Sequence, residues 1–113
     1  MTPSSLPEIQ GPDQRKPLCY APERDKFITY EEIVSGREKI VPLDSLTHAQ
    51  KCKLVIERNR QGPPYTIQVM SGQKLTRDDV IREIELQTDF GNMAVEAEII
   101  HVGELLLKIE KVL

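Results

Sequence analysis

Six apolar residues in the last part of the chain recur at alternating spacings of four and three residues: Val95, Ile99, Val102, Leu106, Ile109 and Leu113. An α-helix turns by 100° per residue, so these side chains would form one narrow row, which we call the C-terminal stripe. Partial alternation around Gly103 leaves a β-hairpin open as an alternative. The abundance of Ala, Glu, Leu and Lys favours a helix over residues 93–112.

The C-terminal stripe has two interpretations. A 3.5-residue period is typical of a seam between two helices, so the stripe predicts contact with a partner protein or a second copy. The alternative is a core helix that packs against its own domain. The apolar surface is widened by four further residues, Leu105, Leu107, Ile100 and Val112. One helix can therefore bury part of this surface against its own domain and still contact a partner.

Proline dominates the beginning of the chain. Five of the eight prolines lie within residues 1–22, where no apolar periodicity is present. Proline fixes its own φ and lacks a backbone donor, so we predict a disordered or extended tail over residues 1–24 and a single domain over residues 25–113. The tail is either solvated or docks on a partner through Leu18 and Tyr20.

Capping signals and periodicity predict the remaining elements. The expected elements are helices over residues 30–35, 45–59 and 77–90, a short edge strand over 39–43 and a half-buried strand over 65–70. Capping boxes at Thr29 and Thr76 start two of the helices, Asp44 or Ser45 can cap the other, and Gly91 is expected to end the helix over 77–90. The fold class is therefore α+β, with a small sheet of two or three short strands packed against about three helices.

Charge is divided unevenly along the chain. Residues 37–77 hold eight basic and three acidic residues, a net charge of +5, whereas residues 78–113 hold three basic and nine acidic residues, a net charge of −6. Such a chain can dock on an oppositely charged partner or pair head to tail with a copy of itself. Alternatively, the two parts face each other within one fold.

A basic set lies on and just beyond the helix expected over residues 45–59: Lys51, Lys53, Arg58 and Arg60. These residues predict contact with phosphates, because neutralisation of the backbone supplies most nucleic-acid affinity. A sequence pI of about 5.4 and an aromatic content of 4% argue against this interpretation. A solvated helix face is the alternative.

Glu98 and His101 stand three residues apart, so on a helix they share one face and can hold the same metal ion. Helical-bundle di-metal sites use this spacing on two helices, together with glutamates from two others. A homodimer would supply two such pairs, with Glu83 or Glu85 as further ligands. The alternative is a glutamate that reaches solvent beside an exposed histidine.

His48 and Cys52 stand four residues apart on an expected helix. They could supply two zinc ligands, but no second pair completes a structural zinc site. They could also form a catalytic cysteine–histidine pair, but no third group is present to orient the histidine. The simpler interpretation is a buried cysteine beside a partly exposed histidine. No phosphate-binding loop, nucleophile elbow or zinc-protease motif is present, so the sequence assigns no catalytic residue and no cofactor.

Composition limits the class of protein. Hydrophobic residues make up 39% of the chain and charged residues 29%, which is typical of soluble domains. The apolar runs are too short to span a membrane, no secretory apolar run is present, and two cysteines cannot build a disulfide framework, so we expect a cytoplasmic protein. We predict a non-enzymatic protein–protein interaction module, a subunit or adaptor of a larger assembly. The alternatives are a nucleic-acid-associated accessory protein and a metal-binding dimer.

Overall fold

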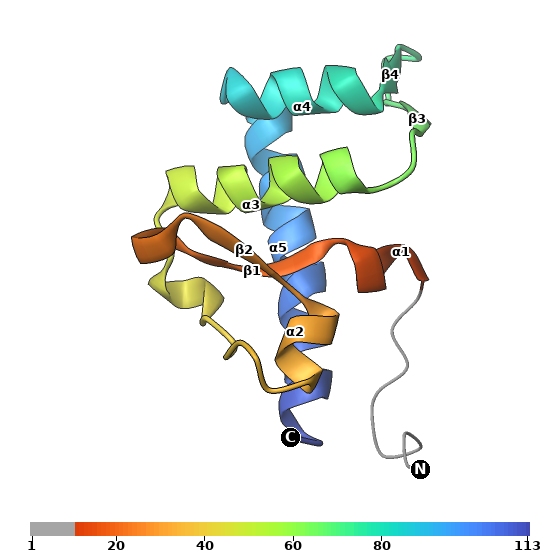
Figure 1. The fold of residues 1–113 in the computed structure, drawn as a ribbon. Coiled ribbons are helices and arrows are strands. Elements are labelled where there is room, and N and C mark those ends of the chain that lie inside the picture. Colours follow the sequence, from red (N-terminus) through yellow and green to blue (C-terminus); the bar gives the residue numbers. More distant parts are fainter. Residues whose placement is uncertain (1–10) are drawn as a thin grey trace.

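The longest helix, α5, runs almost the length of the described molecule, and α4, α3 and the pair of strands β1 and β2 cross it one after another (Figure 1). The computed structural model describes residues 11–113, with side chains from residue 13 onward. In chain order the elements are α1 (Gly11–Arg15), β1 (Pro17–Ala21), η2 (Pro22–Arg24), β2 (Lys26–Thr29), α2 (Tyr30–Val34), η3 (Leu43–Ser45), α3 (His48–Gln61), β3 (Thr66–Gln68), β4 (Lys74–Thr76), α4 (Arg77–Glu85) and α5 (Asp89–Glu110).

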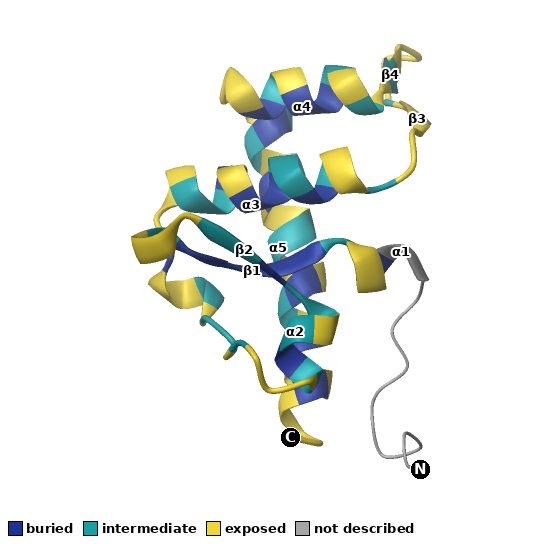
Figure 2. Ribbon diagram, in the orientation of Figure 1, coloured by how far each residue is buried: buried dark blue, intermediate teal, exposed yellow. Residues whose placement is uncertain are grey.

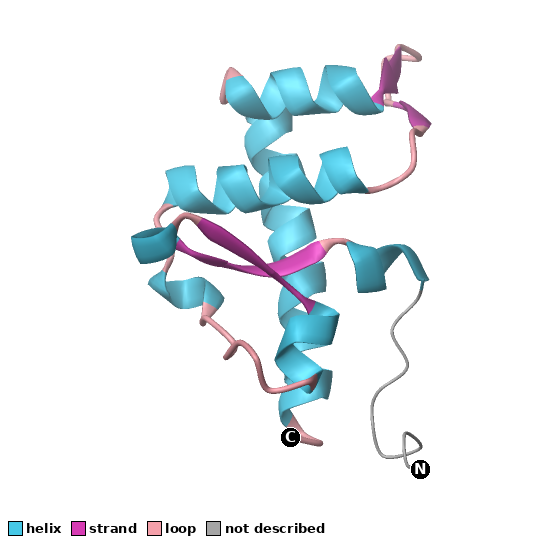
Figure 3. Ribbon diagram, viewed as in Figure 1, coloured by secondary structure: helices cyan, strands magenta, loops and turns pink. Residues whose placement is uncertain are grey.

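The predicted fold class is confirmed: helices dominate, and the strands form two separate antiparallel pairs (Figure 3). In the first pair, β1 runs against β2 with Cys19 opposite Ile28. In the second pair, β3 runs against β4 with Ile67 opposite Leu75. The helix predicted over residues 93–112 is present as α5, so the alternative hairpin around Gly103 is wrong.

The N-terminal segment departs from the tail that was expected over residues 1–24. All five residues of β1 are buried, and Leu18 and Cys19 are inaccessible to solvent. The prolines do not prevent this, because Pro17 occupies the first position of the strand and Pro22 follows its last. The folded domain therefore begins well before residue 25, and the part of the predicted tail over residues 1–10 lies outside the described residues.

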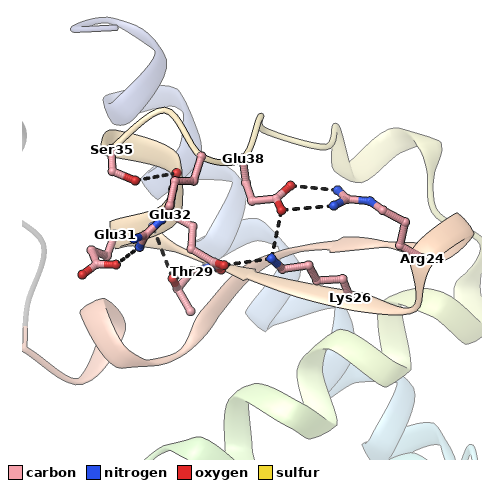
Figure 4. Close-up of polar contacts among 8 residues, drawn as sticks. Arg24, Lys26, Thr29, Glu31, Glu32, Ser35 and Glu38 are labelled. Atoms are coloured by element: carbon pink, nitrogen blue, oxygen red, sulfur yellow. Dashed lines mark hydrogen bonds and ion pairs between the residues drawn. The ribbon is translucent and has the colours of Figure 1, made fainter.

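Polar contacts join η2, strand β2, helix α2 and the loop that follows α2 (Figure 4). Thr29 and Glu32 form the predicted capping box at the start of α2. Glu38 accepts hydrogen bonds from Arg24 and from Lys26, at 2.8 and 2.9 Å. These hydrogen bonds hold the pKa of Glu38 well below its usual range, at about 2.

Two predictions fail in the segment that precedes α3. Residues 39–42 form no strand and lead into the short η3 turn. The cap of α3 is Thr47 rather than Asp44 or Ser45, because Thr47 and Gln50 satisfy each other's backbone N–H groups in a capping box. The Ser45 hydroxyl donates instead to the carbonyl of Pro42.

The connection from α4 to α5 corrects the role expected of Gly91. Helix α4 ends at Glu85, Gln87 takes a left-handed φ of 54°, and Thr88 caps α5. Gly91 therefore lies in the first turn of α5, where the two helices touch. A Cβ atom at this position would stand 2.1 Å from the carbonyl oxygen of Glu83, so glycine is what permits the contact.

The core divides into two main clusters along α5, visible as the buried parts of Figure 2. The N-terminal half of α5 packs on α3 and α4 through a cluster of Cys52, Val55, Val80, Ile84 and Val95. The C-terminal half packs on the β1–β2 hairpin and α2 through a cluster of Leu18, Cys19, Ala21, Ile28, Ile33, Val102, Leu105, Leu106 and Ile109. Within residues 11–113, none of the helices combines the length and apolar character that crossing a membrane requires.

Candidate partner-binding site

The C-terminal stripe faces the inside of the molecule. Val95, Val102, Leu106 and Ile109 are buried and Ile99 is half-buried, so these five side chains belong to the chain's own core. The prediction that they contact a partner is therefore corrected in favour of the core alternative. The last residue of the stripe, Leu113, follows the end of α5 and is exposed.

A second apolar row lies on the opposite side of α5. Met93, Ile100 and Leu107 follow one another at intervals of seven residues, and their side chains are 61%, 66% and 59% exposed. Two turns of a helix cover about 7.2 residues, so the three side chains lie nearly in line. We call this row the outer seam. The sequence hinted at it, since Ile100 and Leu107 were among the residues that widened the apolar surface.

A groove runs beside the C-terminal half of the outer seam. It has a volume of about 450 Å³ and lies between α5 and the segment that replaces the expected strand. Ile40, Pro42 and Leu43 form one side, and Ile100 and Leu107 form the other. We call it the α5 groove, and together with the outer seam it forms one continuous apolar surface.

Three carboxylates line the α5 groove, from Asp44, Glu104 and Glu110, and no basic side chain does. All three residues are exposed, and none of the three forms an ion pair with any residue that the structure describes. The groove therefore combines an apolar floor with carboxylates that form no ion pair among the described residues, and Lys108 lies four residues after Glu104 just outside the lining. A surface of this kind favours a ligand that carries apolar and cationic groups together.

The N-terminal end of the outer seam reaches a second cleft, of about 460 Å³, between the β3–β4 hairpin and helices α3 to α5. Tyr65 and Ile67 of the hairpin side and Phe90 and Met93 of α5 are among its lining residues. The Tyr65 hydroxyl donates to Asn59 Oδ1 at 2.5 Å. Burial, together with a nearby carboxylate, raises the pKa of Tyr65. This cleft extends the apolar surface along most of α5.

The two candidate metal ligands are committed to a buried polar network centred on Arg58. The Arg58 side chain is 1% exposed. Its Nε donates to Glu98 at 2.8 Å, and its terminal nitrogens donate to Asp13 at 2.7 Å and to the carbonyl of Pro17 at 2.9 Å. His101 Nε2 lies 3.3 Å from the other oxygen of Asp13. This network ties α1 and β1 to α3 and α5.

The side chains of this network already bind one another, which leaves few ligands for a metal ion. Burial acts to raise the pKa of Asp13, but hydrogen bonds from Arg58 and His101 outweigh it, so the pKa of Asp13 is lowered. Glu98 and His101 meet different partners, Arg58 and Asp13, instead of converging on one point. Among the described residues, no group of three or more His, Cys, Asp or Glu side chains is arranged to hold a metal.

The basic set proposed for nucleic acid is mostly neutralised by neighbouring acids. Lys53 forms an ion pair with Asp25, which precedes β2, at 2.8 Å, and Arg60 forms one with Glu85 at 3.5 Å. Arg58 is buried, and Lys51 is half-buried. The pairs of Arg58 with Glu98 and of Arg60 with Glu85 also join the basic and acidic parts of the sequence. The uneven charge is thus partly balanced inside the fold, as one alternative held.

His48 and Cys52 do lie close together, with Nε2 and Sγ 3.6 Å apart. The same His48 nitrogen is 3.0 Å from Asn92 Oδ1. Burial raises the pKa of the Cys52 thiol, and it raises that of Cys19 to about 11. Both cysteines therefore carry neutral thiols at physiological pH, a state that suits packing rather than nucleophilic attack.

No family model matches the chain, and no curated protein or solved structure matches it. The functional argument accordingly depends on the geometry and charge of the α5 groove and the outer seam.

Proposed function

We propose that this chain is a non-enzymatic protein–protein interaction module, a subunit or adaptor of a larger assembly, and that it binds its partner through the outer seam and the α5 groove. The observation that carries this proposal is the exposure of Met93, Ile100 and Leu107 in one line on a helix whose opposite face is already buried. Large apolar side chains that are exposed as a continuous surface are typical of interaction sites.

The dimensions of the surface fit a protein partner. The outer seam runs from Met93 to Leu107 of α5, a separation of 14 positions that corresponds to about 21 Å at the rise of an α-helix. The groove and the hairpin cleft lie along it and add further apolar walls. A long, shallow surface of this kind suits a segment of secondary structure better than a compact small molecule.

We also propose that the module acts in the cytoplasm. Its two cysteines, Cys19 and Cys52, are unpaired and buried. Unpaired cysteines are typical of compartments that keep thiols reduced.

Site-specific photo-cross-linking tests the proposed function. A photoreactive phenylalanine analogue would replace Leu107 in the full chain, expressed in the cells of its source, and a matched variant would carry the analogue at the exposed Glu23 of η2. We expect a light-dependent adduct with another polypeptide from position 107 and not from position 23. Equal yields from the two positions, or no adduct from position 107, would contradict the proposal.

A further inference from the structure

We infer that the partner element is an amphipathic α-helix with lysine or arginine beside its apolar row, and that it lies along α5 with its cations at the α5 groove. The inference rests on the proposed function and names the chemistry of the partner. It depends on three observations: the spacing of the outer seam, the room at Gly103 and the charge of the groove.

The spacing of the seam favours a helix as the occupant. Met93, Ile100 and Leu107 repeat every seven residues, which is the repeat with which one helix meets another in a packed pair. Ala97 lies between the first two on the same side and is exposed. An extended strand has a repeat of two residues and would find no matching row of side chains on α5.

Gly103 gives such a helix room to approach. This residue lies in the α5 groove between Ile100 and Leu107. A Cβ atom added there would meet only the Cδ1 atom of Leu43, at an ordinary contact distance of 3.7 Å. The close packing that explains Gly91 is therefore absent at Gly103, and the missing side chain leaves a low point on the surface of α5. Small residues allow helix backbones to come close together.

The charge of the site selects a cationic partner. Asp44, Glu104 and Glu110 surround the apolar floor of the groove, and Glu96 is exposed one turn before Ile100. Flanking charges decide which helices pair, since opposite charges attract and like charges repel. Lysine or arginine beside the partner's apolar row would meet these carboxylates. The same carboxylates repel the phosphates of a nucleic acid.

A second copy of this chain fits the site less well. In an antiparallel pair of α5 helices centred on Ile100, Glu96 of one copy would face Glu104 of the other, and in a parallel pair each glutamate would lie near its own counterpart. Asp89 and Lys111 could pair only at the ends of the antiparallel contact. Like charges therefore meet in the middle of both homodimers in which all three residues of the outer seam are aligned, where they oppose association.

Two synthetic peptides test this inference against the full-length protein. Both would be helical, about 21 residues or three heptads long, with leucine in the apolar row. One would carry lysine and the other glutamate at the flanking positions. Fluorescence anisotropy of the labelled peptides would measure affinity in low and in high salt. We expect the lysine peptide to bind, to weaken in high salt, and to bind far more tightly than the glutamate peptide.

Matched variants locate the binding. Glu104→Lys should reduce the affinity of the lysine peptide by about tenfold, in line with loss of a partly screened charge contact. Glu23→Lys makes the same charge change at an exposed position that does not line the groove and should leave the affinity unchanged. Leu107→Glu should abolish binding. Equal binding of both peptides, no binding of either, or equal effects of the substitutions at positions 104 and 23 would overturn the inference.

The cross-linking experiment separates the two proposals. If position 107 captures a second copy of the chain or a partner segment without basic residues, the interaction module stands and the basic helix is wrong. If position 107 captures nothing beyond the control, the proposed function itself fails.

Discussion

The inner and outer faces of α5 look alike in the sequence but differ in the structure. Leu106 and Leu107 are neighbours of identical chemistry, yet their side chains are 5% and 59% exposed. Gly91 is enclosed by backbone from α4, whereas Gly103 opens onto a groove. Apolar character therefore does not separate buried from exposed positions in this chain. The neighbours that each face meets make the difference.

The glutamates of α5 show the same division. Glu98 is paired with the buried Arg58, and Glu104 forms no ion pair with any of the described residues. Desolvation explains the difference, because a carboxylate that faces the core needs a partner there, and an exposed one keeps its hydration. Unpaired carboxylates around an apolar surface are available to a ligand, whereas Glu98 already has its cation.

The largest expected effect tests the polar anchor of the inner face. Arg58→Ala should lower the free energy of unfolding by about 3–5 kcal/mol, because it leaves Asp13 and Glu98 without their buried cation. Arg60→Ala is the control, since the Arg60 pair is exposed and should contribute less than about 1 kcal/mol. Urea unfolding of both variants checks this, and equal losses would show that the network does not anchor the N-terminal segment.

A core truncation tests the apolar part of the same face. Leu106→Ala should cost about 2–5 kcal/mol in the free energy of unfolding, because it removes buried methyl groups from the cluster around β1 and leaves a cavity. Chemical denaturation measures the loss. A cost below about 1 kcal/mol, which is usual for surface positions, would contradict the assignment of the C-terminal stripe to the core.

Substitution of the two glycines should give effects of opposite sign. Gly91→Ala places a methyl group against the Glu83 carbonyl and should destabilise the protein by about 1–3 kcal/mol. Gly103→Ala places a methyl group in ordinary contact with Leu43 inside a helix and should stabilise it by about 0.5–1 kcal/mol. Thermal unfolding compares the two. Stabilisation by both alanines would mean that α4 and α5 do not touch at Gly91.

Acid should weaken the contribution of Asp13. Its pKa is lowered in the folded chain, so the unfolded chain binds the proton more readily. The stabilisation is therefore present above the ordinary aspartate pKa, about 3.9, and is lost as the pH falls through the lower folded value. Asp13→Asn should be less stable than wild type at pH 6, and the two should converge as the pH falls below the lowered folded pKa of Asp13. A difference that is independent of pH would argue against an ionised Asp13.

Local signals predicted much of the fold. Short-range patterns act within one element, so the capping boxes of Thr29 and Thr76 and the helix over the C-terminal stripe are present as expected. Tertiary context decided the rest. Residues 17–21, at the end of the proline-rich start of the chain, form a buried strand because they pack against apolar neighbours, and Gly91 packs against a helix instead of ending one. The local sequence predicts neither the packing of residues 17–21 nor the contact of Gly91 with α4.

The candidate site was only partly visible in the sequence. The extra width of the apolar surface on α5 was evident, but which row faced the core depended on packing against β1, α3 and α4. The α5 groove also needs the segment around Pro42, which was expected to be a strand. Its three carboxylates come from positions 44, 104 and 110. Position 44 is far in the chain from positions 104 and 110, so no spacing in the sequence reveals the cluster.

The free energy of unfolding of Leu107→Glu tests most directly the claim that the outer face of α5 is free in the isolated chain. Because Leu107 is exposed, the variant should unfold within about 0.5 kcal/mol of wild type in urea, with the same dependence on denaturant. That result would leave the outer seam available for a partner. A loss of about 2 kcal/mol or more, as expected for a core position, would contradict the division of α5 into a buried and an exposed face.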